Sequence, residues 1–402
     1  MIDNISVKNR VKHFLLNILC LFGKRKNEIV MESHPDFSCN TYELFRYMIK
    51  NNSLPGVKYV WILHDFNSRR VIDEENVDYI EMNPRGIINK FKTYYRKYNA
   101  RCVISCNSIF PKYTGPKDQL HFFLDHGSHL KDVRIHGKRI DIDCDYYFSQ
   151  SKFFVPYILQ QYAIDEKSIV STGLPRYDQL YRKNSNIKDI VPNHMRFNNI
   201  IIWVPTFRKH FQGTRIDCDT KYPYGLPIIN TQEDVNALIE HLKKYNCLLI
   251  IKPHPAQDLT SLKEFGCENI MLIYNSDLQI HNVQINEILS QTDAMITDYS
   301  SIYYDYLELD KPIAITLDDF ESYSQQKGFV FEDFKEVIKG EYLYDIDGLF
   351  KFIEHVSKEI DICKKEREKV CNMIDDYHDD QSTKRTCDFV IEKLKHQKRK
   401  YI

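Results

Sequence analysis

The chain has 402 residues, enough for two domains that each bury a full hydrophobic core. Hydrophobic residues make up 43% and charged residues 28%, as in soluble globular proteins, and the net charge of −1 excludes a global field that would attract nucleic acid. Eleven cysteines occur without a C-x-x-C pair, which excludes the usual zinc-site spacings and favours a reduced, cytoplasmic protein.

Residues 1–27 differ from the rest of the chain. Their apolar side chains recur at the spacing of one helical face, and lysines and arginines surround them against a single acid, Asp3. A basic amphipathic helix of this kind can lie among the headgroups of an anionic membrane. We therefore expect a membrane-associating segment on the cytoplasmic face of the cell membrane, without a secretory signal or a membrane-spanning run. A helix packed on the protein's own core is the alternative.

Residues 28–181 predict a first Rossmann-like domain, because short apolar runs alternate with stretches of helical spacing. The predicted strands are Ile29–Met31, Tyr59–Leu63, Cys102–Ile104, Phe122–Leu124 and Tyr146–Phe148, and the predicted helices include Tyr42–Ile49 and Ile87–Tyr98.

Two of these predicted strands end in polar residues. The first leads into Glu32-Ser33-His34-Pro35-Asp36-Phe37-Ser38 and Asn40, and another leads into Asp125-His126-Gly127-Ser128. Gly127 permits a tight turn that would expose His126, and histidine is the side chain best suited to exchange a proton near neutral pH. His126 is therefore a candidate general base, with a structural hydrogen bond in the turn as the alternative.

Residues 182–199 are polar and without periodicity, and they predict a linker. A second Rossmann-like domain is expected over residues 200–348, and a charged helical segment over residues 349–402. The predicted elements of the second Rossmann-like domain are the strands Ile200–Val204, Leu248–Ile251, Ile270–Ile273, Ala294–Ile296 and Ile313–Ile315 and the helix Glu233–Lys244.

The strand ends of the second domain predict a phosphate site. Arg208 follows one strand, Lys252 and His254 follow the next, and a third leads into a Ser-rich turn before a helix. That turn contains Thr297, Asp298, Ser300 and Ser301. Ligands of parallel α/β sheets lie beyond the carboxyl ends of strands, where cations and free N–H groups attract an anion. A helix N-cap and a solvated loop are the alternatives.

The motifs exclude some chemistries, and the predicted phosphate site does not require a metal. No G-x-G-x-x-G and no Walker A motif occurs, so neither dinucleotide redox nor ATPase chemistry is indicated. Asp141-Ile142-Asp143 lies in a predicted turn, and cationic side chains with helix N-termini can stabilise a leaving nucleotide without a metal. We expect no metal and no cofactor.

Six motifs in order make the sequence resemble the CDP-glycerol glycerophosphotransferases of teichoic acid and capsule synthesis, which include poly(glycerol phosphate) polymerases and primases. The motifs are His126-Gly127, STGLPRYDQL (Ser171–Leu180), WVPTFR (Trp203–Arg208), KPHP (Lys252–Pro255), TDYSSIYYDYLELDKP (Thr297–Pro312) and KGFVFEDF (Lys327–Phe334).

The resemblance implies an α/β, GT-B-like fold of two facing Rossmann-like domains with a cleft between them, the first binding acceptor and the second binding the CDP-linked donor. It implies transfer of glycerol phosphate, or a related polyol phosphate, to a hydroxyl of a polyol-phosphate or lipid-linked glycan acceptor, with release of CMP. The partners are then this donor, this acceptor and the inner membrane surface, with no nucleic acid.

The same resemblance implies roles for individual residues. His126 looks like the general base, Arg208 and His254 like groups that hold the donor's pyrophosphate, and Asp298 like a contact to the polyol. Thr297, Ser300 and Ser301 look like phosphate donors. Asp125 stands where family members commonly have Trp, and it either orients His126, raises its basicity or points away. The chain also lacks the long N-terminal region of the large polymerases, so we expect a size closer to a primase or a compact capsule polymerase.

Two other functions remain open at this point. A GT-B glycosyltransferase that uses a CMP- or UDP-sugar would use the same strand ends, and it would make product from a sugar nucleotide alone. A non-catalytic membrane-associated scaffold would be expected to lose the polar strand ends, which this chain retains. Glycerol versus ribitol, and primase versus polymerase, also remain open.

Overall fold

The structure is a computed structural model that describes residues 26–66, 76–108, 110, 119–134, 136–182, 187–191, 194–208, 216–254 and 267–398. The predicted membrane-associating segment lies outside the described residues except for its last two. No helix in the described ranges is both long and apolar enough to cross a membrane.

The chain divides into two compact units. The first takes the described residues up to His126, then Arg134–Asp178 and those from Gln381 on, and the second takes Gly127–Val133 and Gln179–Asp380. The domain limits predicted from the sequence stay a prediction. That prediction does not include two features of the observed division. Gly127–Val133 belongs to the second unit, and the residues from Gln381 on belong to the first.

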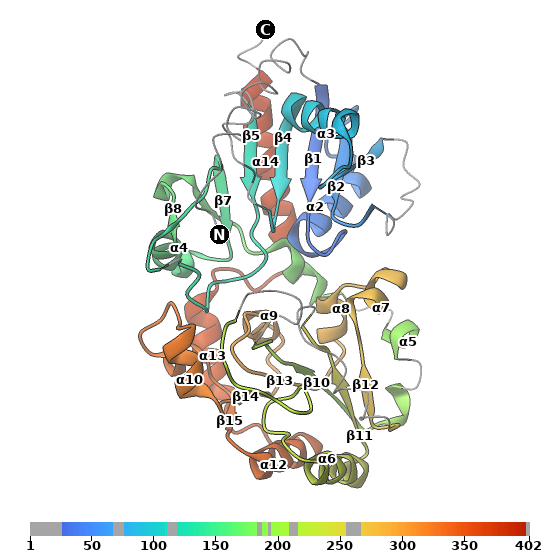
Figure 1. The fold of residues 1–402 in the computed structure, drawn as a ribbon, viewed down its shortest axis with the longest axis vertical. Helices are drawn as coiled ribbons and strands as arrows, with labels where there is room; N and C mark the ends of the chain where they lie inside the picture. Colours follow the sequence, from blue (N-terminus) through green and yellow to red (C-terminus); the bar gives the residue numbers. More distant parts are fainter. Residues whose placement is uncertain are drawn as a thin grey trace. The chain divides into compact units, whose positions relative to one another are not determined.

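The first unit contains a parallel sheet in the order β3-β2-β1-β4-β5-β7-β9 (Figure 1). Its strands are β1 (Lys26–Glu32), β2 (Lys58–Leu63), β3 (Val77–Glu81), β4 (Ala100–Ser105), β5 (Leu120–Phe123), β7 (Tyr146–Ser149) and β9 (Ile169–Ser171). A small second sheet pairs β6 (Ile140–Asp141) with β8 (Tyr162–Ala163). The parallel α/β arrangement predicted from the sequence is confirmed.

Helices cover both faces of this sheet, which explains why its strands are apolar on both sides. Successive side chains of a strand point to opposite faces, so Ile29 and Met31 enter one core while Val30 enters the other. The first core also receives α2 (Cys39–Lys50) and α14 (Ser382–Lys398), and α3 (Ile87–Asn99) lies along β1 and β4. A short helix, α4 (Val155–Gln161), completes the unit.

The second unit contains a parallel sheet in the order β12-β11-β10-β13-β14-β15. Its strands are β10 (Asn199–Val204), β11 (Cys247–Ile251), β12 (Ile270–Leu272), β13 (Ala294–Thr297), β14 (Ile313–Thr316) and β15 (Glu341–Leu343). Its helices are α5 (Ile187–Ile190), α6 (Gln232–Tyr245), α7 (Asn275–Ile280), α8 (Ile285–Leu289), α9 (Ile302–Leu307), α10 (Phe320–Gln326), α11 (Phe334–Val337), α12 (Ile346–Ser357) and α13 (Lys364–Ile374).

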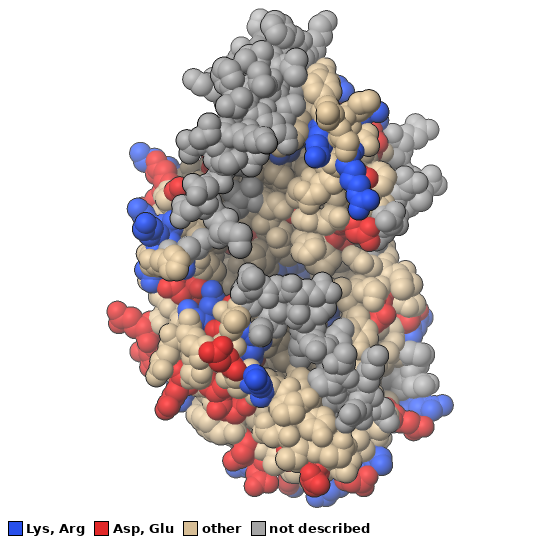
Figure 2. Space-filling model, in the orientation of Figure 1, with Lys and Arg blue, Asp and Glu red and all other residues tan. Residues whose placement is uncertain are grey.

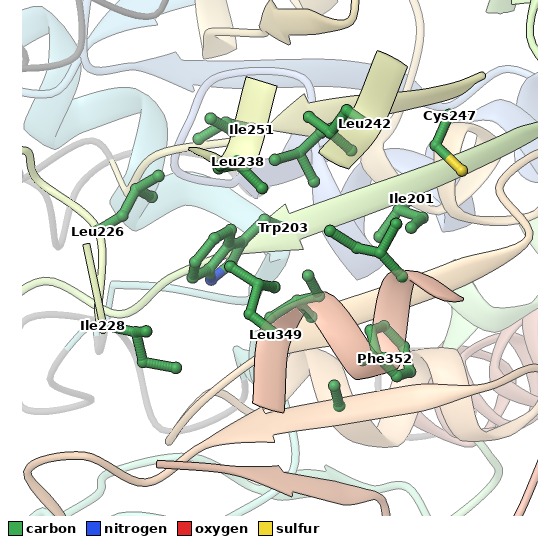
Figure 3. Close-up of a cluster of buried hydrophobic side chains, with 14 of the residues drawn as sticks. Ile201, Trp203, Leu226, Ile228, Leu238, Leu242, Cys247, Ile251, Leu349 and Phe352 are labelled. Atoms are coloured by element: carbon green, nitrogen blue, oxygen red, sulfur yellow. The ribbon is translucent and has the colours of Figure 1, made fainter. Parts of the chain in front are cut away.

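The core of this sheet is built around Trp203, which is fully buried (Figure 3). Alternate residues of β10 and β11 meet Leu238 and Leu242 of α6 at helical spacing. Leu349 and Phe352 of α12 pack into the same cluster. The charged C-terminal stretch is therefore divided between the two units, since α12 belongs to the core of the second unit and α14 belongs to the core of the first.

Candidate active site

Each sheet has one point where the order of its strands reverses, and ligands of open α/β sheets bind beside such a point. In the first unit the reversal lies between β1 and β4, and in the second between β10 and β13. The structure places the predicted residues at these carboxyl edges. Arg208, Lys252 with His254, and the Thr297–Ser301 turn follow the adjacent strands β10, β11 and β13, and Asp125 with His126 follows β5 in the first unit.

Asp125 holds His126 in the turn after β5. Asp125 has a φ of 50°, a left-handed conformation that aspartate tolerates better than most residues, and its side chain is buried. Its Oδ1 accepts the backbone N–H of His126 at 2.6 Å and lies 3.1 Å from His126 Nδ1. The hydroxyl of Tyr147 donates to Oδ2. With Nδ1 turned to a carboxylate, a neutral imidazole keeps its acceptor lone pair on Nε2.

The imidazole of His126 is 61% exposed, so it is accessible to a substrate. Desolvation by the surrounding protein opposes its protonation, but the hydrogen bond and the charge of Asp125 outweigh this and raise the pKa of His126 to about 8. Of the alternatives for Asp125, the structure shows the one in which its carboxylate contacts His126. The turn therefore presents an oriented imidazole with a raised pKa.

Two buried residues, Asn40 and Arg176, hold the backbone of this turn through hydrogen bonds. The Asn40 amide donates to the carbonyl oxygens of Leu124 and Asp125 at 3.2 and 2.9 Å, and its oxygen accepts the backbone N–H of Arg176 at 3.1 Å. The Arg176 guanidinium donates to the carbonyl oxygen of His126. Asn40 follows a predicted strand end and Arg176 lies in the STGLPRYDQL motif, but neither role could be predicted, because the two residues are 136 positions apart in the sequence.

A Glu–His pair lies at the same edge of the sheet, at the end of β1. Glu32 is fully buried, its Oε1 lies 2.8 Å from His64 Nε2, and its carboxylate accepts from the backbone and hydroxyl of Ser108. Burial raises the pKa of Glu32, but the hydrogen bonds from His64 and Ser108 lower it further than burial raises it. The bond to Glu32 raises the pKa of His64. Sequence reasoning missed His64, which follows β2 without a recognised motif.

In the second unit, Arg208 is buried and its five N–H groups all have acceptors. Nε and Nη2 donate to the Asp319 carboxylate at 2.7 and 3.0 Å, and Nη1 donates to Asp298 Oδ2 at 2.8 Å and to the carbonyl oxygen of Thr206 at 2.9 Å. The remaining Nη2 bond goes to the hydroxyl of Tyr222 at 3.4 Å. In this structure Arg208 joins the ends of β10, β13 and β14, and its predicted contact with a pyrophosphate stays a prediction.

Two other predicted donor-binding residues are also engaged by the protein. Asp298 is fully buried and accepts the backbone N–H of Thr206 at 3.0 and 3.1 Å in addition to Arg208. The Thr297 hydroxyl donates to the carbonyl oxygen of Val204 at 2.9 Å. Their predicted contacts with the donor stay predictions, and the geometry shows them linking β13 to β10. Asp319 was missed, although it follows a strand that the sequence predicts.

Lys252 is the buried cation of this edge that lacks a carboxylate partner within the described residues. Its Nζ donates to Asn275 Oδ1 at 2.6 Å and to the carbonyl oxygen of Pro253 at 3.4 Å. Burial lowers the pKa of Lys252 to about 8, against the opposing charge of Asp277. An anion at this edge would stabilise the charged form.

The remaining predicted residues, His254, Ser300 and Ser301, are at least partly exposed to solvent. His254 is exposed and its ring lies 4.6 Å from that of Phe207, centroid to centroid. Ser300 and Ser301 are half-buried at the start of α9, and neither hydroxyl has a partner within the described residues. These hydroxyls and the Lys252 ammonium therefore have capacity left to bind a phosphate.

The described residues contain one group with the spacing of metal ligands, formed by Glu308, Cys371 and His378. It lies at the end of α9, away from the strand ends, and His378 Nδ1 already pairs with Glu308 Oε2 at 3.1 Å. The predicted independence from metals and cofactors stays a prediction.

Residues 14–392 match the family model described as CDP-glycerol:poly(glycerophosphate) glycerophosphotransferase. The chain is 24% identical over 385 residues to the teichoic acid poly(glycerol phosphate) polymerase of Bacillus spizizenii, covering 88% of this chain and 89% of that protein. It is 26% identical over 247 residues to the teichoic acid ribitol-phosphate polymerase TarK of Staphylococcus aureus, covering 59% of this chain but 43% of that protein.

The solved structure of the wall teichoic acid polymerase TagF resembles this one with a TM-score of 0.73 and 19% sequence identity, covering 97% of this chain and 96% of that one. At this identity the likeness establishes the fold alone. The α/β, GT-B-like fold class predicted from the sequence is confirmed by this likeness and by the two parallel sheets.

Proposed function

The chain belongs to the CDP-glycerol:poly(glycerophosphate) glycerophosphotransferase family, and from this premise we propose that it transfers glycerol phosphate, or a related polyol phosphate, from a CDP-linked donor to an acceptor hydroxyl. The acceptor is a polyol-phosphate or lipid-linked glycan of teichoic acid or capsule type, and CMP is the second product. The observation that carries the proposal is the His126–Asp125 pair, an exposed and oriented base at the carboxyl edge of a Rossmann-like sheet.

His126 removes the proton from the acceptor hydroxyl. The hydroxyl oxygen forms a bond to the phosphorus that carries the polyol, and the bond from that phosphorus to the bridging oxygen breaks. The electron pair leaves with CMP, and the proton goes to His126 Nε2. The imidazolium is stabilised by Asp125, whose carboxylate lies 3.1 Å from Nδ1. Attack on phosphorus requires mainly positioning and stabilisation of charge.

The donor's pyrophosphate is bound in the second unit by Lys252, His254, Ser300 and Ser301. Support comes from the buried ammonium of Lys252, which has no carboxylate partner within the described residues, and from the two serine hydroxyls at the start of α9. Arg208, Asp298 and Thr297 act on the donor by fixing the strand ends that carry these groups. No metal enters this scheme.

The acceptor is anchored in a membrane, and the basic amphipathic residues 1–27 bring the enzyme to the inner membrane surface. Sedimentation with vesicles of anionic lipid tests this, using the full chain and a variant without residues 1–26. Equal sedimentation of both proteins would remove the membrane role of this segment.

The reaction is tested by incubating the purified full chain with CDP-glycerol, and separately with CDP-ribitol, together with a polyol-phosphate lipid acceptor. CMP release names the donor, and the masses of the products show one added unit for a primase or a ladder for a polymerase. The glycosyltransferase alternative predicts no CMP from either CDP-polyol and product from a sugar nucleotide, and that result would overturn the proposal.

A further inference from the structure

A cavity of about 640 Å³ lies in the first unit, apart from His126. Its floor contains Ile62 at the end of β2, Met82 just after β3, and Phe110. One wall is the loop that includes Arg85, and another is the face of α3 that carries Lys90 and Lys97. The cavity thus extends from the carboxyl edge of the sheet, where β2 and β3 end, along α3 to Lys97 near the end of that helix.

The charged side chains that line this cavity within the described ranges are all positive. They are Arg85, Lys90 and Lys97, and none of the described lining residues is an aspartate or glutamate. None of the three forms an ion pair within the described residues, whereas Arg96 on the same helix pairs with both Glu28 and Asp78. On α3, the fold therefore neutralises Arg96, whereas Lys90 and Lys97 line the cavity and Lys92 does not.

The surroundings of Lys97 destabilise its charged form. Its Nζ lies 4.6 Å from the ring centroid of Phe110 and 5.6 Å from that of Tyr94, contacts that stabilise an ammonium only modestly. Burial lowers the pKa of Lys97 to about 8, with no carboxylate to oppose the shift. A buried cation without a counter-charge is stabilised when an anion enters the cavity beside it.

The start of α3 adds to the same field. Gly86 is the N-cap residue with a φ of 78°, no side chain caps the helix, and its first turn contains no acid. The free N–H groups of the first turn and the positive end of the dipole of this 13-residue helix therefore remain available. Figure 2 shows lysine and arginine side chains gathered over the region that α3 occupies in Figure 1.

We propose that this cavity binds a phosphodiester group of the polyol-phosphate acceptor, upstream of the hydroxyl that reacts. This inference rests on the proposed function. The cavity belongs to the same unit as His126 and reaches the carboxyl edge of the same sheet, where three strand spacings, about 14 Å, separate β2 from β5. A phosphate held there would keep a growing chain on the enzyme while its terminal hydroxyl reaches the base.

The test replaces Lys97 with Gln in the full chain and measures acceptor-dependent CMP release against the concentration of a soluble oligo(glycerol phosphate). We expect the KM for this acceptor to rise about tenfold, as for loss of one charge-assisted hydrogen bond, with the KM for the CDP-linked donor unchanged. Lys97→Arg should restore most of the affinity. Lys92→Gln is the matched control, because Lys92 is exposed on the same helix and does not line the cavity.

An unchanged acceptor KM in Lys97→Gln would overturn the inference. Loss of binding to phosphatidylglycerol vesicles with an unchanged acceptor KM would overturn it as well, because the cavity would then hold a lipid headgroup. Calorimetric titration of oligo(glycerol phosphate) separates this inference from the proposed function. If the wild type binds the oligomer and Lys97→Gln does not, the cavity assignment stands even where no CDP-polyol is turned over.

Discussion

At the scale of single residues, the chemistry depends on what Asp125 does to His126. A histidine in a turn titrates near 6.5 when nothing acts on it, and Asp125 raises the pKa of His126 to about 8. Asp125 also fixes Nδ1, so one feature sets both the orientation and the basicity of the imidazole. The left-handed backbone of Asp125 makes this possible, because it turns the chain so that the carboxylate meets the next residue.

This pair predicts the pH dependence of the reaction. His126 accepts a proton only when it is neutral, so acceptor-dependent kcat/KM should rise as the pH increases through about 8. In Asp125→Asn the pKa of His126 should fall toward its ordinary value of about 6.5, and the rise should move to lower pH with a reduced maximum. CMP release measured across this range checks it. A rise at the same pH in both proteins would contradict the role of Asp125.

The same raised pKa has a consequence for stability. The contact of His126 with Asp125 stabilises the fold fully below about pH 6.5, and this contribution disappears as the pH rises through about 8. The difference in thermal midpoint between wild type and Asp125→Asn should therefore shrink with increasing pH over this interval.

Arg208 gives a residue-scale prediction of a different kind. Arg208→Met would leave Asp298 and Asp319 buried without their cation, a change that typically costs about 3–5 kcal/mol. Unfolding in urea measures the loss. Bonds from Arg208 lower the pKa of Asp319 further than burial raises it, so the stability that this pair contributes is present above about pH 4 and disappears as the pH falls below that.

Lys243→Met is the matched control for Arg208. Its pair with Glu240 is exposed to solvent, so its removal should leave the free energy of unfolding nearly unchanged. A similarly small change in Arg208→Met would show that the buried network does not hold the strand ends together.

At the scale of elements, the site is a property of parallel strands that end together. β10, β11 and β13 are neighbours in one sheet, so residues far apart in the sequence reach one edge. The apolar runs of these strands are easy to predict, because both faces of the sheet are covered and nearly every position is apolar. β3 was missed for the opposite reason: it lies at the edge of its sheet, its sequence VDYIE contains two acids, and most of its residues are only partly buried.

The partners of the site residues could not be predicted in the same way. Arg208 was recognised at the end of its strand, but its carboxylates lie 90 and 111 residues further along the chain. Asn40 and Arg176 are 136 residues apart and meet under the His126 turn. Strand periodicity predicts that a residue reaches the edge of the sheet, but the order and register of the strands decide which residues meet there.

The return of α14 to the first sheet also gives a prediction. Gly173 follows β9 with a φ of +75°, and a Cβ at this position would lie 2.2 Å from Ser382 Oγ at the start of α14. Gly173→Ala should therefore destabilise the protein by about 1–3 kcal/mol, through backbone strain and the displacement of α14. Gly56→Ala is the control, since Gly56 has a φ of +72° but open space around it. If both variants lose the same free energy of unfolding in urea, the contact with Ser382 of α14 has no effect on stability.

At the scale of the whole molecule, charge acts locally. The net charge of −1 gives no attraction to a polyanionic substrate, yet cations without an ion pair in the described part of the chain lie where phosphates are expected: Lys252 in the second unit and Lys97 in the first. Family membership, two parallel sheets and an oriented base agree with one another. Composition alone could predict none of these local charges, because it gives only the sum of the charges over the whole chain.

Replacement of His126 tests most sharply whether this side chain is the base of a polyol-phosphate transfer. The rate of acceptor-dependent CMP release is measured for wild type and for His126→Ala, with CDP-glycerol and CDP-ribitol as donors and with circular dichroism to confirm that both proteins fold. We expect a fall of about 10²- to 10⁴-fold in the variant while donor binding is retained. Turnover near the wild-type rate would show that His126 is not the base.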